Sequence, residues 1–444
     1  MELGVGAVIQ TSLYKPLANN DEETISRIVY SAKRFFRIVG IGLVVLVIGT
    51  LIAYPIYVRD KFDIFSTILL ICALSITMFA QYFFGIVYSL LIQADQKIFI
   101  YNIIQIVVIV LNTIVCAFLI INGFSIQIVK FVTAAIFLIR PIALSLYVKK
   151  HYNIYKVQLK GDELPQKWNG IAQHIAAYIL DNTDIIVLTL FASLSDVSIY
   201  STYYLIVHSI RLLLVSLTNG ISSYYGNLLA LEEKDKLKTD FNKYNFFIHL
   251  ITTFMYGSTI ILLVPFVLIY TSGVNDADYN QYIFGFILVM GQYFYCIRRS
   301  FNMLILAAGH YKQTQMSAII ESLLNVIISI IVVFNFGLIG VAIGTAIAML
   351  FRCIFFAIYC SNNIINRSII LFFKEMLADF LILSISFFIG WYFNKNIVIS
   401  DYIIWIKYGF IIAFIIGIIV IFVNLIFNFK ELKYYISNFK KKTK

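Results

Sequence analysis

The chain has 444 residues, of which 61% are hydrophobic and only 13% are charged, and its mean hydropathy is +0.89. A soluble domain has too little interior to hide that much apolar surface, so soluble enzymes and soluble binding modules are excluded. Repeated apolar runs of about 20 residues match the roughly 30 Å hydrocarbon layer of a membrane. The runs lack the alternation of β-barrel strands. The sequence therefore predicts an all-α polytopic membrane protein.

The net charge of +11 is unevenly distributed along the chain. When alternate loops are assigned to opposite sides, 23 of the 34 Lys and Arg residues fall on one side and three, Arg59, Lys61 and Lys395, on the other. Positively charged loops stay in the cytoplasm. We therefore predict a multi-pass protein of the cytoplasmic (inner) membrane with a cytoplasmic C-terminus, and nucleic acid is not expected as a partner.

Taken in order, the chain begins with half a helix at most over residues 1–14, followed by a cytoplasmic turn at Lys15-Pro16. Residues 21–36 have an apolar stripe beside basic side chains, which is typical of a helix lying on an anionic leaflet and also of a solvated connector. Twelve full spans are predicted, at 37–58, 65–93, 99–122, 126–148, 169–191, 196–228, 244–270, 281–308, 314–336, 338–360, 376–394 and 402–427.

Three sets of residues recur at nearly one spacing, which indicates an internal repeat. Thr11-Ser12-x-Tyr14 matches Ser222-Ser223-x-Tyr225 at an offset of 211 residues. The other matches are Gln81-Tyr82-Phe83 with Gln292-Tyr293-Phe294 at 211, and Thr133-Ala134 and Arg140 with Thr345-Ala346 and Arg352 at 212. The repeat predicts two related helical lobes. The predicted domains are an N-terminal lobe at 1–148, an inter-lobe loop at 149–168, a C-terminal lobe at 169–360, two additional transmembrane helices within 361–427 and a basic tail at 428–444.

The two lobes differ in the length that precedes the first repeated motif. The second lobe has 53 residues before Ser222, whereas the first has ten before Thr11. The difference corresponds to about one and a half helices. We expect the first lobe to be truncated at its N-terminus, either because the reading frame starts upstream of Met1 or because the chain is shortened.

Several ionisable side chains fall inside predicted spans, where a charge that faces lipid costs ~2.5–3.5 kcal/mol or more. They are therefore expected to face the bundle interior or a watery cavity. Three polar stripes have helical spacing: His174, Tyr178 and Asp181, with Asp184 on the adjoining edge; Tyr204, His208 and Arg211; and Gln292, Tyr295 and Arg299, beside Arg298 and Asn302. Because a guanidinium binds phosphate oxygens in pairs, the mid-span arginines favour an anionic ligand.

These stripes supply the candidate site. The predicted substrate-binding residues are Arg211, Arg298, Arg299, His208 and Tyr204, and the predicted coupling or cavity residues are Asp181, Asp184 and His174. A structural interpretation stays open for several of them. Asp181 and Asp184 could instead join helices through hydrogen bonds or an ion pair with Arg211, and the histidines could be packing groups.

Other polar residues are assigned structural roles. Arg140 and Arg352 lie about eight residues from the cytoplasmic ends of their helices, so they are expected to reach the interface or to cap a helix. Glu321 is expected to be an interface residue or the partner of a neighbouring arginine. Gly340-x-x-x-Gly344 is a helix-packing motif.

The loops leave little room for an enzyme's active site. The longest outer loop, residues 271–280, carries Asp276 and Asp278 but no basic group, and the cytoplasmic loops lack a glycine-rich phosphate loop. The cysteines lie within predicted spans without metal-ligand spacing, at positions 72, 116, 296, 353 and 360. We predict a protein that is not an enzyme, with no catalytic residues, no metal and no cofactor.

Three short segments carry a family resemblance. They are Leu13-Tyr14-Lys15-Pro16-Leu17-Ala18, Ile305-x-Ala307-Ala308-Gly309-His310 with Lys312-Gln313-Thr314-Gln315, and the run from Phe336 to Thr345. Together they resemble the polysaccharide-biosynthesis flippases of the multidrug/oligosaccharidyl-lipid/polysaccharide exporter superfamily, which also contains the MATE exporters and the lipid II flippases. The resemblance implies two six-helix lobes around a central cavity, plus two helices that form a groove for a lipid tail.

The resemblance also implies a function. A flippase of this family moves undecaprenyl-diphosphate-linked oligosaccharide repeat units across the membrane by alternating access, and Arg211 is the best candidate to hold the diphosphate. Its partners would be the lipid-linked oligosaccharide, membrane lipids and other polysaccharide-assembly proteins. Two alternatives stay open, namely a MATE-like cation-coupled exporter of small molecules and a membrane-embedded glycan polymerase or acyltransferase.

Overall fold

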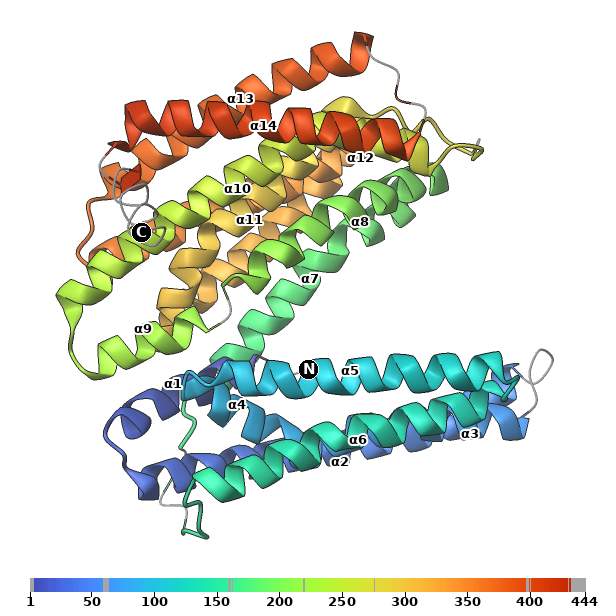
Figure 1. The fold of residues 1–444 in the computed structure, drawn as a ribbon, viewed down its shortest axis with the longest axis vertical. Coiled ribbons are helices and arrows are strands. Elements are labelled where there is room, and N and C mark those ends of the chain that lie inside the picture. The colour runs from blue at the N-terminus through green and yellow to red at the C-terminus, as the bar shows by residue number, and fades with distance from the viewer. Residues whose placement is uncertain are drawn as a thin grey trace. The chain divides into compact units, whose positions relative to one another are not determined.

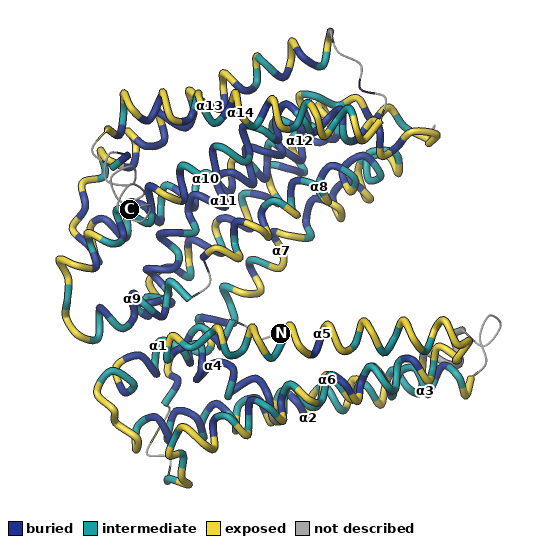
Figure 2. Tube along the Cα trace, viewed as in Figure 1, coloured by how far each residue is buried: buried dark blue, intermediate teal, exposed yellow. Residues whose placement is uncertain are grey.

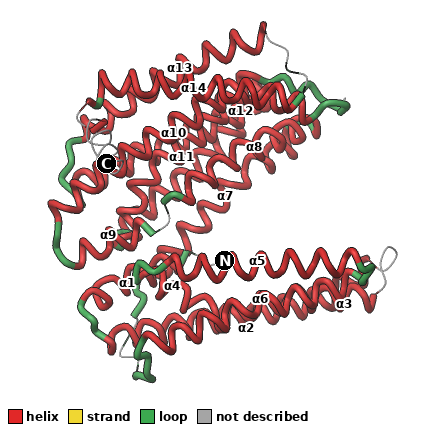
Figure 3. The backbone as a smooth tube through the Cα atoms, in the orientation of Figure 1, coloured by secondary structure: helices red, strands yellow, loops and turns green. Residues whose placement is uncertain are grey.

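The computed structural model describes residues 4–432 except 59–63, 159–160, 162, 219, 275, 397–398, 400 and 430, and most of these residues are helical. These residues form helices joined by loops and contain no strand (Figure 3). The predicted all-α class is therefore confirmed. The basic tail from residue 433 onward and the outer-loop residues Arg59 and Lys61 lie outside the described residues.

The helices group into two compact units (Figure 1). The first comprises Met1–Gly170 and Ser222–Leu231, and the second comprises Ile171–Ile221 and Glu232–Lys444. The first unit contains α1 (Val5–Ala18), α2 (Glu22–Val58), α3 (Ile64–Ala80), a π-helical turn (Gln81–Gly85), α4 (Ile86–Ala94), α5 (Ile98–Ile121), α6 (Ile126–His151) and α9 (Ile221–Ala230). The second contains α7 (Lys167–Phe191), α8 (Leu194–Ser216), α10 (Lys234–Tyr270), α11 (Tyr282–Ala308), α12 (Tyr311–Asn363), α13 (Ile369–Asn396) and α14 (Tyr402–Phe427).

Helices α1 and α9, which carry matching repeat motifs, approach each other closely within the first unit. A Cβ atom added at Gly226 of α9 would lie 2.1 Å from Cδ2 of Tyr14 on α1. The Tyr14 ring therefore lies directly on the α9 backbone, and only glycine fits at position 226.

The predicted surface helix at 21–36 is wrong. Residues 22–58 form the single helix α2, so the amphipathic stretch continues directly into the first full span. Its apolar stripe is packed inside the first unit, where Ile25, Val29 and Phe36 are buried. The stripe therefore meets protein instead of a lipid leaflet, because the neighbouring helices α1 and α4 cover it.

Helix α11 is the central helix of the second unit. It packs mainly against α12 and α10, and also against α8. Figure 2 shows that α11 is mostly buried, whereas α5 in the first unit is mostly exposed, with Val108 as its buried residue. Large aromatic side chains such as Phe284, Tyr293 and Phe301 fill the space around α11. The ionisable residues of α11 therefore lie inside the helix bundle.

Helix α12 is two antiparallel segments joined at Gly337. That residue has φ 51° and ψ −126°, a conformation that favours glycine. The second segment then returns so close to the first that a Cβ atom at Gly344 would lie 2.3 Å from Oγ of Ser329. The two predicted spans at 314–336 and 338–360 are therefore present, and Gly340 and Gly344 have the packing role that the sequence predicted.

The predicted single span at 196–228 is broken. Helix α8 ends at Ser216, and α9 begins at Ile221 after Gly220, whose φ is 86°. Glycine tolerates this left-handed conformation, which a continuous helix excludes. The break places α8 and α9 in different compact units.

The two C-terminal helices pack on α10 and on each other (Figure 1). Ile261, Ala378, Ile382, Ile412 and Ile416 belong to one buried apolar cluster that joins α10, α13 and α14. Within the described residues, nine helices are long and apolar enough to cross a membrane. One of these is the 53-residue α12, which is long enough for two crossings. Helices α11 and α13 are not among the nine, but they lie where two further spans are predicted from the sequence.

Candidate functional site

Helix α8 presents two chemically different faces. It starts with a capping box in which Ser193 and Asp196 satisfy each other's backbone N–H groups, so its register is well defined. Tyr204, His208 and Arg211 follow one face at helical spacing. Leu205, Ile206 and Ser209 lie on another face, which lines an apolar pocket.

Arg211 is buried, with 6% of its surface exposed, and its guanidinium is fixed from several directions. Nη1 donates to Oδ1 of Asp181 at 3.1 Å and to Oε1 of Gln292 at 3.2 Å. Cζ lies 3.7 Å from the centre of the Tyr295 ring, a close cation–π contact. The side chain of Asp181 is 38% exposed, so this ion pair reaches the surface of the second unit. The open interpretation that Asp181 pairs with Arg211 is confirmed.

A second charged group lies deeper, around Glu321 of α12. This carboxylate is 1% exposed and pairs with Arg298 of α11 and, at 2.6 Å, with Nη1 of Arg352. The prediction that Arg352 reaches the membrane interface is wrong, because a buried carboxylate neutralises it instead. Arg298 is likewise held by Glu321, while its guanidinium also stacks on Tyr295.

The charges of these two groups do not cancel. Arg211, Arg298 and Arg352 are opposed by Asp181 and Glu321, which leaves one positive charge in excess. Arg299 adds a second positive charge. Its Nε donates to the neutral Oγ1 of Thr218 at 3.1 Å, and it has no acidic partner among the described residues. The buried carboxylate of Asp184, which accepts from Tyr200 of α8, opposes part of this charge, so the four arginines exceed the three carboxylates beside α8 by one positive charge.

The remaining predicted residues of the polar faces are partly accessible. Tyr204 stacks between Tyr200 and His208, with ring centroids 5.5 Å and 5.0 Å away. Tyr204 and His208 are half-buried and His174 on α7 is exposed. Such flat, partly exposed rings suit contact with sugar rings or other flat ligands.

Asp184 has a different environment from Asp181. It is 3% exposed and accepts hydrogen bonds from Tyr200 and Thr345, each at 2.7 Å, and from Asn325 at 3.2 Å. All of these donors are neutral, and no cationic side chain pairs with it in the described part of the chain. Oδ1 of Asn325 is buried there without a hydrogen-bond partner. A buried carboxylate in neutral polar surroundings favours the uptake of a cation or a proton.

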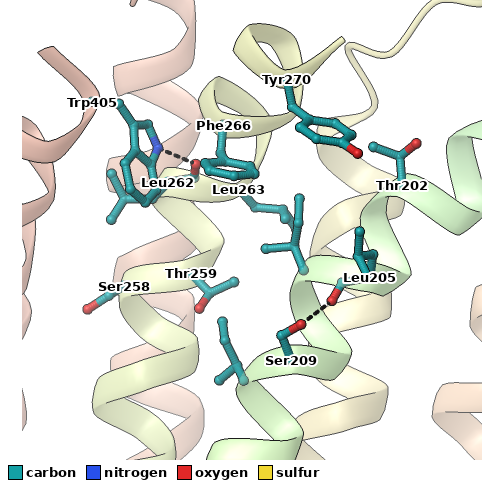
Figure 4. A pocket seen from close by; sticks show the side chains of 12 residues that line it. Thr202, Leu205, Ser209, Ser258, Thr259, Leu262, Leu263, Phe266, Tyr270 and Trp405 are labelled. Atoms are coloured by element: carbon teal, nitrogen blue, oxygen red, sulfur yellow. Dashed lines mark hydrogen bonds between the residues drawn. The ribbon is translucent and has the colours of Figure 1, made fainter. Parts of the chain in front are cut away.

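A pocket of about 550 Å³ lies between α8, α10 and α14 (Figure 4). Figure 4 shows Leu205 and Ser209 on one side and Leu262, Phe266 and Trp405 on the other. Two polar groups of the pocket wall already have hydrogen-bond partners in the protein, shown as dashed lines in Figure 4. Oγ of Ser209 donates to the Leu205 carbonyl, and Nε1 of Trp405 donates to the Leu262 carbonyl. The surface offered to a ligand is therefore apolar.

Sequence reasoning missed several of these features. The partners of Asp184 lie 16, 141 and 161 residues away from it, so no local spacing indicates them. The open interpretation that Glu321 is the partner of a neighbouring arginine is confirmed, although its pairing with Arg352 spans 31 residues across the turn of α12. The apolar pocket combines three helices, of which α14 lies outside the repeat. The helical spacing in the sequence did identify the polar face of α8.

The fold is that of MATE-family transporters of the MOP superfamily. The chain is similar to an outward-facing multidrug resistance MATE family transporter, with a TM-score of 0.63 and 16% identity over 80% of this chain and 82% of that one. It is also similar to a MATE transporter of Vibrio cholerae, VcmN in the bent form, with a TM-score of 0.64 and 12% identity over 81% and 83%.

A further similar structure is a MOP superfamily transporter from Pyrococcus furiosus, described as having a binding pocket of reverse polarity that suggests a different function. Its TM-score is 0.66 and its identity 15%, over 80% of this chain and 82% of that one. No protein-family model and no curated protein matches the chain. The predicted MATE-like fold is confirmed, and the flippase subfamily stays a prediction.

Proposed function

We propose that this protein is a flippase that translocates undecaprenyl-diphosphate-linked oligosaccharide repeat units across the cytoplasmic membrane for surface polysaccharide assembly. The observation that carries the proposal is the division of α8 into two faces. Residues of one face, the last of which is Ile210, line the apolar pocket. The next residue, Arg211, points to the other face and forms the ion pair with Asp181. A lipid-linked diphosphate sugar needs these two environments side by side.

Each part of such a substrate has a matching group. The polyprenyl chain is proposed to enter the apolar pocket, where burial of each CH₂ contributes about 0.8 kcal/mol. The diphosphate is proposed to meet Arg211, whose ion pair with Asp181 reaches the surface of the second unit, and Arg299, which has no acidic partner among the described residues. Tyr204, with His208 and His174 on the accessible faces, is proposed to contact the sugars.

Arg298 has a less direct role in this proposal. Its charge is satisfied by Glu321, and it stacks on the same Tyr295 ring as Arg211, at 4.7 Å from the ring centre. We propose that it positions Tyr295 and Arg211 and does not touch the substrate. Alternating access of the two lobes, which the family resemblance implies, would carry the substrate across.

The proposal is tested by Arg211→Gln combined with Asp181→Asn, which removes the guanidinium without leaving an unpaired buried charge. Surface polysaccharide should fall at least about tenfold, as expected for loss of one charge-assisted contact, while the amount of protein in the membrane is unchanged. Leu212→Ala is the matched control, because Leu212 is the next residue on the same helix and is exposed. Full export by the double variant would remove Arg211 from the site.

A second candidate function is a MATE-like cation-coupled exporter of small molecules, which the environment of Asp184 favours. A carboxylate with only neutral donors around it is suited to bind a cation during transport. Deleting the gene separates the two functions. A flippase predicts lost surface polysaccharide with unchanged drug tolerance, and an exporter predicts the reverse. Asp184→Asn should remove the dependence on an ion gradient in either case.

A further inference from the structure

A buried charged cluster joins α13 to the second lobe. Glu375 and Asp379 on α13 face His249 on α10, and Arg367 precedes α13 in the chain. All four side chains are buried. Helix α13 has no counterpart in the repeat, so these charges belong to the junction between the repeated lobe and the additional helices.

His249 and Asp379 form the centre of this cluster. Nδ1 of His249 lies 2.5 Å from Oδ2 of Asp379, within hydrogen-bond distance. The hydroxyl of Tyr293 on α11 donates to the same carboxylate oxygen at 2.7 Å. Asp379 therefore joins three helices, α10, α11 and α13, at one point.

Glu375 has its own fixed partners. Nη2 of Arg367 donates to Oε1 at 2.6 Å, and Nδ2 of Asn245 donates to Oε2 at 2.9 Å. Nε2 of His249 lies 3.9 Å from that same Oε2. This nitrogen has no hydrogen-bond partner among the residues that the structure describes. A proton on it would therefore face a carboxylate.

The charge balance of the cluster depends on one proton. Arg367 and Glu375 cancel each other. If His249 is protonated, it cancels Asp379 and the cluster is neutral; if His249 is neutral, one negative charge stays buried where solvation is poor. The other titratable groups that face the cluster are Tyr293 and Cys353, which are uncharged in their usual form at neutral pH.

A proton fits this place better than a metal ion. Within the described part of the chain, no group of three or more His, Cys, Asp and Glu side chains is arranged to hold a metal ion. Nδ1 of His249 is also already engaged with Asp379. The partnerless Nε2 beside Glu375 is the atom where an exchangeable proton would be held.

We propose that His249, Asp379 and Glu375 form a proton-binding site that fastens α13 and α14 to the second lobe and so controls the apolar pocket. The link to the pocket is structural. Ala378 and Ile382, which flank Asp379, pack in the same cluster as Ile412 and Ile416 of α14. Helix α14 also supplies Trp405 to the pocket wall. The inference goes beyond the proposed function and does not depend on which substrate is carried.

Thermal unfolding of the purified full chain in detergent tests proton binding. Because the protonated cluster is the neutral one, stability should be highest at low pH and should decrease as the pH rises. We expect the Tm to fall by about 3 °C or more between about pH 5.5 and about pH 8.5. Asp379→Asn leaves a neutral cluster without the proton, so this part of the pH dependence should disappear.

Two further variants make the result specific. His249→Gln leaves the buried Asp379 carboxylate without its imidazole partner, so its Tm should be lower than that of the wild type at about pH 5.5, where the wild-type cluster is neutral. His310→Gln is the matched control, since His310 is half-buried outside the cluster and its ring contacts Tyr359; it should keep the wild-type pH dependence. A wild-type pH dependence that persists in Asp379→Asn, or a His249→Gln variant as stable as the wild type at about pH 5.5, would overturn the proposal.

Fluorescence of Trp405 tests the link to the pocket. The other tryptophans, Trp168 and Trp391, are exposed and can be replaced by phenylalanine. In vesicles whose phosphatidylcholine carries brominated acyl chains, quenching of Trp405 should increase with pH as α14 loosens and its bond to Leu262 weakens. Asp379→Asn should remove the increase. Quenching that stays constant in the wild-type chain over this pH range would contradict the proposal. Neither thermal unfolding nor Trp405 quenching uses a transported substrate. A negative result in either measurement therefore does not bear on the proposed function.

Discussion

Two arginines at equivalent positions of the repeat, Arg140 and Arg352, have opposite electrostatic environments. Arg352 in the second unit is buried and paired with Glu321 at 2.6 Å. Arg140 in the first unit is half-buried and donates to Gln105 at 2.6 Å and to Gln81 at 2.7 Å. These amide oxygens are neutral, and Arg140 has no acidic partner in the described part of the chain.

One repeated residue therefore has two physical roles in the two lobes. In the second lobe the arginine is half of an internal ion pair that joins the two segments of α12, because Glu321 and Arg352 lie on opposite sides of Gly337. In the first lobe, the positions corresponding to Glu321 are Ile109 and Val110. The first lobe therefore retains a positive charge that the second lobe neutralises within its core.

Removing Glu321 should have the largest effect on this comparison. Glu321→Gln leaves Arg298 and Arg352 buried without a counter-charge, which should cost about 3–5 kcal/mol of the free energy of unfolding. Denaturant unfolding of the purified protein measures the loss. Glu321→Gln with Arg352→Met lowers the excess charge and should recover part of it. A single variant as stable as the wild type would show that Glu321 does not hold the core together.

The next largest effect is expected at the turn of α12. Gly344→Leu places a side chain against the backbone of Ser329, where even a Cβ atom has no space, and should cost about 1–3 kcal/mol in the same measurement. The control is Val132→Leu, at the repeat-equivalent position of α6, which is half-buried and should change stability by about 0.5 kcal/mol or less. Equal effects at both positions would mean that the second lobe is not the more tightly packed of the two.

The smallest effects come from the two arginines themselves. Arg352→Met removes a charge-assisted bond but leaves Glu321 paired with Arg298, so about 1–2 kcal/mol should be lost. Arg140→Met removes a half-buried cation whose contacts, two amides and the Tyr101 ring at 5.9 Å, are all neutral, and the change in the free energy of unfolding should be about 0.5 kcal/mol or less. The comparison fails if Arg140→Met is the more destabilising substitution.

The sequence predicts features that depend on local spacing. The separate spans on either side of Gly337 and the packing role of Gly340 and Gly344 follow from residues close together in the chain, and the repeat follows from short local motifs that recur at one offset. The pairing of Arg211 with Asp181 was one of two open interpretations. It could be foreseen because both residues lie on polar stripes of consecutive helices.

Features that depend on distant contacts could not be predicted. His249 and Asp379 are 130 residues apart, and no local spacing relates the two. The amphipathic stretch at 21–36 was misinterpreted, because an apolar stripe packs equally well on lipid or on neighbouring helices. The break after α8 depends on one left-handed glycine, Gly220, whose conformation the apolar pattern around it does not indicate.

The most direct test of the central claim is translocation by the purified full chain in liposomes, with a fluorescent undecaprenyl-diphosphate-linked oligosaccharide as the probe. The wild-type chain and Leu212→Ala should move the probe to the opposite leaflet faster than protein-free vesicles do. The Arg211→Gln, Asp181→Asn variant should not. A wild-type rate equal to that of empty vesicles, together with uptake of a small cationic dye into the same vesicles, would contradict the flippase and favour the exporter.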